Sequence, residues 1–235
     1  MQTIDYKIPA GHELLACSVD YAGDASRPSI ICLHGGGPSG KASTQYLAAH
    51  LQKNGKSVIR FDFSGQGEST GEMADSSLKK RLAETKAVMD RFNMGGKISV
   101  IGSSMGGYIA CALAKEIQIE NLILFGPAAY TIRAWDLPFG SGFTETIRAE
   151  NSFMDSDIVD LLAHYHGRAL FIIGEHDEII PKPVVALYMQ ALSGCSVFEK
   201  YTVPDCPHPI HRWVMKNPHA RAEIENRVLN FIESA

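Results

Sequence analysis

The sequence predicts an α/β domain built on a mainly parallel central sheet. Short apolar, β-branched runs alternate with longer helical patterns along most of the chain. Most of these runs are apolar throughout, as expected for strands that helices cover on both faces. The length of 235 residues fits one large domain covering 1–235 better than two small ones. Ligands of such sheets bind beyond the carboxyl ends of the strands, so functional residues are expected just after strands.

The expected elements follow this alternation in order. The first two strands are joined through Pro9–Gly11, as in a hairpin, and helices separate most of the later ones. The expected strands cover 4–8, 14–19, 29–33, 57–61, 97–102, 121–125, 169–173 and 196–203. The expected helices cover 43–53, 77–92, 105–116, 181–192 and 218–232.

One strand-poor segment, at about 127–167, interrupts the alternation. It contains the turn-rich stretch DLPFGSG and five aromatic residues: Tyr130, Trp135, Phe139, Phe143 and Phe153. A connection this long is usually functional or partly helical. We interpret it as a small lid insertion with a helix around 155–164, in which Trp135, Phe139 and Phe143 are candidates for substrate binding. The alternative is an aromatic-rich surface segment that only packs on the core.

Composition limits the partners. The formal net charge is −4 and the basic residues are scattered, which disfavours nucleic acid or an anionic membrane as the main partner. Five cysteines without a CxxC pair indicate free thiols in a reducing compartment. No run approaches the length of about 20 apolar residues that spans a bilayer. We therefore expect a soluble cytoplasmic protein that requires no metal or cofactor; its oligomeric state is not indicated.

The segment Gly102-Ser103-Ser104-Met105-Gly106 matches G-x-S-x-G at the junction of a predicted strand and a predicted helix. This spacing suits a serine on a sharp strand-to-helix turn, because side chains two residues before and after it would collide. The two glycines select Ser104 rather than Ser103 as a nucleophile. Without its context, the motif would also fit a Gly-Ser turn that caps a helix.

A serine nucleophile that attacks a carbonyl needs two backbone N–H donors for the oxyanion. One should come from Met105, the residue after the nucleophile. The other should come from the glycine-rich run that follows strand 29–33, which begins at His34. We predict Gly36 as this donor, with Gly35 as the next candidate, and we expect His34 to orient the loop rather than to titrate in catalysis.

The same loop has a competing interpretation. Residues 35–41 fit G-x-x-x-x-G-K, most of a phosphate-binding P-loop, and they also lie between a strand and a helix. A P-loop requires a Ser or Thr after the lysine, however, and Lys41 is followed by Ala42. Nucleotide binding therefore stays open as an alternative function.

Taken together, these motifs resemble the α/β-hydrolase superfamily over nearly the whole chain. Residues 62–69, DFSGQGES, are similar to the D-x-x-G-x-G-x-S turn of many members, and to small bacterial esterases and serine-aminopeptidase-like hydrolases. The resemblance implies the α/β-hydrolase fold, with helices on both faces of the sheet and a short lid. It implies a structural role for this turn, in which Asp62 and Ser69 form local hydrogen bonds.

The resemblance also implies an acid and then a histidine after the nucleophile. Asp177 matches the acid, because it lies in the G-x-x-D-x-x-x-P turn that follows strand 169–173. His208 matches the base after the last strand, and His211 is a rival three residues later.

With Ser104, Asp177 and His208 as its catalytic residues, the chain is expected to be a serine hydrolase. The expected substrate is a small carboxylic ester, with a thioester or a small amide as variants. A non-catalytic binding protein of the same fold is the alternative from another class.

Overall fold

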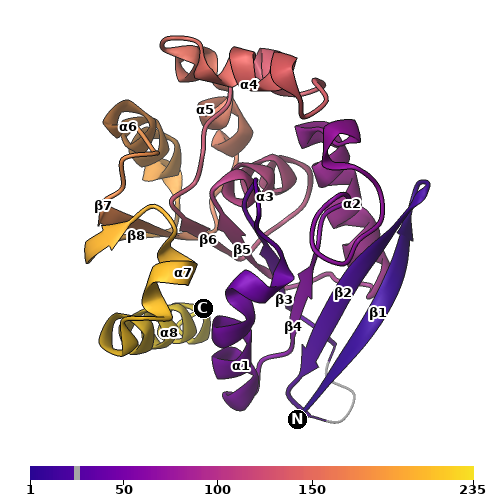
Figure 1. Cartoon of the computed structure of the whole chain (residues 1–235). Helices are drawn as coiled ribbons and strands as arrows, with labels where there is room; N and C mark the ends of the chain where they lie inside the picture. The colour runs from indigo at the N-terminus through magenta and orange to yellow at the C-terminus, as the bar shows by residue number, and fades with distance from the viewer. Residues whose placement is uncertain (24–26) are drawn as a thin grey trace.

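The computed structural model describes residues 1–23 and 27–235. An eight-stranded sheet runs through its middle in the order β1-β2-β4-β3-β5-β6-β7-β8 (Figure 1). The strands are β1 Gln2–Ala10, β2 Glu13–Tyr21, β3 Ile30–Leu33, β4 Val58–Phe61, β5 Ser99–Ser103, β6 Asn121–Phe125, β7 Arg168–His176 and β8 Val197–Pro207. The α-helices are α1 Gln45–Lys53, α2 Leu78–Arg91, α3 Met105–Glu116, α4 Ser141–Arg148, α5 Ile158–Leu162, α6 Lys182–Ala191, α7 Ile210–Val214 and α8 Pro218–Glu233.

The sheet is parallel from β4 to β8. Strand β2 pairs antiparallel with β1 and with β4, so among the eight described strands it alone has the opposite direction. The predicted hairpin and the predicted mainly parallel sheet are both confirmed. The carboxyl ends of β3, β5, β6, β7 and β8 consequently share one edge of the sheet.

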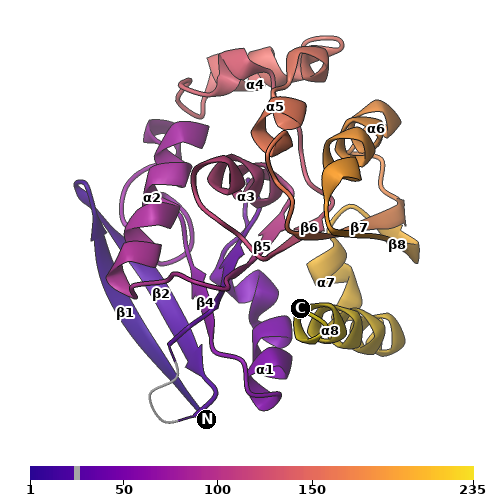
Figure 2. The ribbon, with the colours of Figure 1, turned by 180° about the vertical axis from the view of Figure 1, so that it is seen from behind.

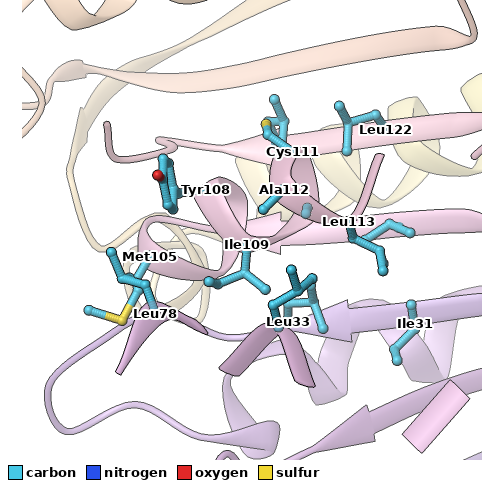
Figure 3. Packing of buried hydrophobic residues seen from close by; sticks show 14 of the residues in the cluster. Ile31, Leu33, Leu78, Met105, Tyr108, Ile109, Cys111, Ala112, Leu113 and Leu122 are labelled. Atoms are coloured by element: carbon cyan, nitrogen blue, oxygen red, sulfur yellow. The ribbon is translucent and has the colours of Figure 1, made fainter. Parts of the chain in front are cut away.

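Alternate residues of the central strands divide the core into two layers. Val100 of β5 and Ile31 of β3 pack with α2, α3, α5 and α6, whereas Ile101 and Ile30 pack with α1, α7 and α8. Figure 2 shows the same two helical layers from behind. In the first layer, side chains of α3 such as Leu113 lie over those of the sheet (Figure 3). This period-2 burial accounts for the continuous apolar runs of the strands.

Three of the differences from the sequence-based expectation lie close to the candidate site or in the expected lid. The segment 127–167 contains α4, which was not predicted, and its second helix is only α5, shorter than the expected 155–164. Strand β8 continues to Pro207, beyond the predicted end at 203, because its pairing with β7 resumes after an irregularity at Gly174–His176. The short helix α7 then separates His208 from α8.

Helix α4 lies farther from the sheet than α5 in both views (Figures 1 and 2). Helix α5 contacts α3 and α6, so it belongs to the first helical layer. All five cysteines are free, and only Cys195 is partly exposed. In the described part of the chain, no helix combines the length and the apolar character that crossing a membrane requires.

Candidate active site

Ser104 occupies a sharp turn between β5 and α3. Its backbone angles are φ 49° and ψ −114°, a conformation that non-glycine residues rarely adopt. A Cβ atom on Gly102 would lie 2.6 Å from the carbonyl oxygen of Gly106, and one on Gly106 would overlap the Leu33 carbonyl. The turn is therefore possible only with glycine at both positions, as the motif predicts. Such strained backbone is common at functional sites.

Three side chains from the carboxyl edge of the sheet form one hydrogen-bonded chain. His208 Nε2 lies 3.2 Å from Ser104 Oγ, and His208 Nδ1 lies 2.8 Å from Asp177 Oδ2. Ser104 follows β5, Asp177 follows β7 and His208 follows β8. Parallel strands thus bring together residues that are up to 104 positions apart. The arrangement can pass the serine proton to an imidazole that a carboxylate orients.

Asp177 is held in its ionised form. Burial by itself would raise the pKa of this carboxyl, but the hydrogen bonds from His208 and from the backbone lower it below its ordinary value of 3.8. The amides of Ile179 and Ile180 both donate to Asp177 Oδ1 at 2.9 Å. The other oxygen, Oδ2, is left for His208. The carboxylate therefore favours the neutral tautomer of His208 that carries its proton on Nδ1 and presents a bare Nε2 to Ser104.

Gly126, directly after β6, is a part of this site that the sequence did not single out. Its φ is 47°, and an added Cβ would lie 3.2 Å from Asp177 Oδ2 and 3.4 Å from His208 Nδ1. Any side chain here would press on the hydrogen bond between the acid and the base. Glycines often follow buried strands, so the sequence alone gave no reason to assign Gly126 to the site.

The predicted oxyanion donors lie next to Ser104. Met105 is the first residue of α3, where backbone N–H groups have no partner inside the helix. A Cβ on Gly36 would lie 3.0 Å from Met105 Cε, and one on Gly35 would lie 3.4 Å from Ser104 Cβ. The glycine loop therefore passes close enough to the serine for its backbone to reach a substrate. The donor role itself stays a prediction.

His34 is fixed inside this loop. Its Nε2 accepts a hydrogen bond from the Phe63 amide at 3.1 Å, and its Nδ1 donates to the Gly35 carbonyl at 2.8 Å. Burial lowers its pKa to about 4, so the ring is neutral. These contacts give His34 an orienting position, in agreement with the expectation from the sequence.

His211, the rival base, is engaged elsewhere. Its Nε2 lies 2.6 Å from Ser103 Oγ, and its Nδ1 lies 3.0 Å from the hydroxyl of Tyr46. Burial lowers its pKa to about 4. The two neighbouring serines thus contact different histidines: Ser104 contacts His208, and Ser103 contacts His211. The contact between Ser103 and His211 was not predicted from the sequence.

The P-loop-like segment is occupied by carboxylates. The backbone amide of Lys41 donates to Asp62 Oδ1 at 2.6 Å, and its Nζ contacts both Asp62 and Glu68. Asp62 also accepts from the Glu68 amide, and Ser69 Oγ donates to the Asp62 carbonyl. These carboxylates engage the Lys41 amide and ammonium, donors that a P-loop would direct at phosphate, which weighs against nucleotide binding there. Its local hydrogen bonds match the structural role that the resemblance implied.

The three aromatic candidates for substrate binding lie together but not at Ser104. Phe139 and Phe143 are buried edge to face, with 4.6 Å between ring centroids. Phe139 also lies over the guanidinium of Arg81 at 4.9 Å, and Trp135 packs against Tyr108. None of the three borders the cavity that contains Ser104. Their role in substrate binding therefore stays a prediction.

That cavity has a volume of about 770 Å³ and opens between the glycine loop, α1 and α7. Ser104, His208, Gly35 and Gly36 border it. Elsewhere, Glu175, His176 and Asp205 have ligand atoms close enough to hold a metal, but all three are exposed. Exposed acidic groups commonly cluster without an ion, so we assign them no metal role.

Comparison with known proteins agrees with this geometry. Residues 28–146 match the family model described as alpha/beta hydrolase fold. Over 80 residues the chain is 35% identical to the mitochondrial palmitoyl-protein thioesterase ABHD10 of Homo sapiens. The aligned segment covers 33% of this chain and 26% of that protein. The chain thus spans about a quarter of the length of this relative.

Solved structures resemble the whole chain. The ferulic acid complex of Est1E from Butyrivibrio proteoclasticus is 21% identical, with a TM-score of 0.74 over 97% of this chain and 98% of that one. An esterase from Exiguobacterium antarcticum is 17% identical, with a TM-score of 0.73 over 98% and 100% of the two chains. Likeness at these identities establishes the fold alone. With the family match over half of its residues, the chain belongs to the α/β-hydrolase fold family.

Proposed function

We propose that this protein is a serine hydrolase that cleaves small carboxylic esters through an acyl-enzyme on Ser104. The observation that carries the proposal is the hydrogen-bonded chain from Ser104 Oγ through His208 to Asp177, with distances of 3.2 and 2.8 Å. It has the geometry that acyl transfer by a serine requires. The strained turn at Ser104 and the adjoining glycine loop support the same reaction.

In the first half-reaction, His208 Nε2 takes the proton of Ser104 Oγ while this oxygen bonds to the substrate carbonyl carbon. Asp177 stabilises the imidazolium that forms. The amides of Met105 and Gly36 donate to the oxyanion of the tetrahedral intermediate. The bond to the leaving group then breaks, and the departing oxygen takes the proton from His208.

The second half-reaction repeats these steps with water. His208 removes a proton from the water as its oxygen attacks the acyl carbon, and a second oxyanion forms in the same place. The bond between the acyl carbon and Ser104 Oγ breaks, and Oγ recovers its proton from His208. The products are a carboxylic acid and the regenerated serine.

A fluorophosphonate probe tests the nucleophile directly. The wild-type protein is expected to be labelled, Ser104→Ala is expected to lose the label, and the neighbouring Ser103→Ala provides a matched control that keeps it. Absence of labelling in the wild type would favour a non-catalytic binding protein. Labelling that survives Ser104→Ala would place the nucleophile elsewhere.

The substrate class needs a separate measurement. A panel of p-nitrophenyl esters of increasing acyl length would give the acyl preference. Thioesters with the same acyl groups would separate esterase from thioesterase activity, a distinction raised by the relatives named above. Equilibrium titration with Mg²⁺ and ATP or GTP tests the remaining alternative, for which saturable binding lost in Lys41→Ala would be required.

A further inference from the structure

The cavity beside Ser104 is shared by the catalytic candidates and by residues of three helices. Ser104 and His208 border it together with residues of α1, α7 and the start of α8. Arg212 and Met215 are exposed and Arg221 is partly exposed, which places them at the solvent side of the lining. Helices α7 and α8 contact each other, and α1 contacts α8 (Figure 1). The inner part of the wall includes the apolar side chains of Phe125 and Ile210.

The permanently charged side chains that line this cavity are both arginines. Its lining includes Arg212 and Arg221 but no aspartate or glutamate. In the described ranges 1–23 and 27–235, Arg212 forms no ion pair. Arg221 uses Nε for Glu225 at 2.8 Å and stacks over the Tyr46 ring at 5.3 Å, which leaves its two terminal nitrogens for another acceptor. His211 adds no charge at neutral pH, since burial lowers its pKa to about 4.

The position of His208 in the lining identifies which half of an ester would occupy the cavity. The leaving group receives its proton from His208 Nε2, so it must lie on the His208 side of Ser104. Helix α7 begins two residues after His208, and Arg212 lies within that helix. A leaving group that departs past His208 therefore points along α7 toward the two arginines.

We propose that the leaving-group half of the substrate carries an anion, a carboxylate or a phosphate, which Arg212 and Arg221 bind at the outer end of this cavity. The inference rests on the proposed ester hydrolysis. A guanidinium presents paired N–H donors that match both kinds of anion. The apolar inner wall suits the aromatic or aliphatic part between that anion and the scissile bond.

Acetate esters that differ only in the leaving group provide the test: 4-acetoxybenzoate, 4-acetoxyphenyl phosphate and the neutral 4-acetoxybenzamide. The quantity compared is kcat/KM for each anionic ester divided by kcat/KM for the neutral one. In Arg212→Gln and in Arg221→Gln this ratio is expected to fall about three- to tenfold. Added salt should reduce the wild-type ratio. A larger fall in the ratio for 4-acetoxybenzoate would indicate a carboxylate as the bound anion, and a larger fall for 4-acetoxyphenyl phosphate would indicate a phosphate.

Arg133→Gln is the matched control, because Arg133 is an exposed arginine outside the cavity lining. If the Arg212 and Arg221 variants keep the ratio of this control, the proposal is wrong. Arg221→Lys retains the charge and should restore part of the ratio, which separates charge from lost packing against Tyr46. The rate of fluorophosphonate labelling checks that each variant keeps an intact Ser104.

A second substrate pair tests the assignment to the leaving group. 4-Nitrophenyl hydrogen succinate carries its anion on the acyl half, and 4-nitrophenyl butyrate is its neutral counterpart. Should the arginine variants lower this ratio instead, the anion belongs to the acyl half and the proposal is overturned. Failure to hydrolyse any neutral ester would instead refute the proposed function, and this inference with it.

Discussion

Replacing Asp177 by Asn tests the orientation of the base. The asparagine oxygen can still accept from the Ile179 and Ile180 amides, so the turn after β7 should keep its conformation. Its NH₂ group would then face His208 Nδ1, where the carboxylate now accepts at 2.8 Å. A donor at this point favours the tautomer that carries its proton on Nε2. That tautomer cannot remove the proton of Ser104.

The expected loss in kcat is roughly 10⁴-fold, the size measured for the same change in another serine hydrolase. At 1.36 kcal/mol for each factor of ten, this corresponds to about 5 kcal/mol of barrier. The assay is hydrolysis of p-nitrophenyl acetate under saturating conditions, with thermal unfolding measured on the same samples. Glu178→Gln, a change at the exposed neighbouring carboxylate, is the control. Turnover of Asp177→Asn within tenfold of wild type, with an unchanged fold, would refute the assigned roles of Asp177 and His208.

Three further predictions concern stability. Ser103→Ala removes the partner of His211 Nε2, so the free energy of unfolding measured in urea should fall by about 1–3 kcal/mol. An unchanged midpoint would mean that this hydrogen bond does not stabilise the fold. The pKa of His34 and of His211 is lowered to about 4, whereas an unfolded histidine titrates near 6.5. The unfolded chain therefore binds more protons between these values, and stability should fall by up to about 3 kcal/mol per histidine as pH drops from about 6.5 to 4. Urea unfolding across this range checks the slope, which His211→Gln should reduce, and a flat profile would contradict the assignment. Gly102→Ala would place a Cβ 2.6 Å from the Gly106 carbonyl oxygen, so the melting temperature should fall. A melting temperature equal to that of the wild type would show that the turn can relax more than we expect.

Much of the fold was predictable because its signals are local. Continuous apolar strands, such as β6, reflect burial on both faces, and G-x-S-x-G reflects steric exclusion around a single residue. Helix α4 was missed because its sequence, SGFTETIR, begins with helix-poor residues and has few apolar positions. The cationic end of the cavity was also missed. Arg212 and Arg221 belong to separate helices, so their proximity to one cavity is a property of the packing and not of any spacing.

The choice between His208 and His211 shows where such local reasoning ends. Both histidines follow the last strand, and either could satisfy the order of nucleophile, acid and base. Which histidine serves as the base depends on α7. This helix turns His211 inward to Ser103 and Tyr46, on the face of the sheet that α1, α7 and α8 cover. His208 precedes that helix and stays at the sheet edge, where Asp177 can orient it. Burial also disqualifies His211 chemically, because a pKa of about 4 makes its ring a weaker base than an unperturbed histidine. Helix α7 is therefore held to β5 by the contact between His211 and Ser103. His208, two residues before this helix, lies against Ser104.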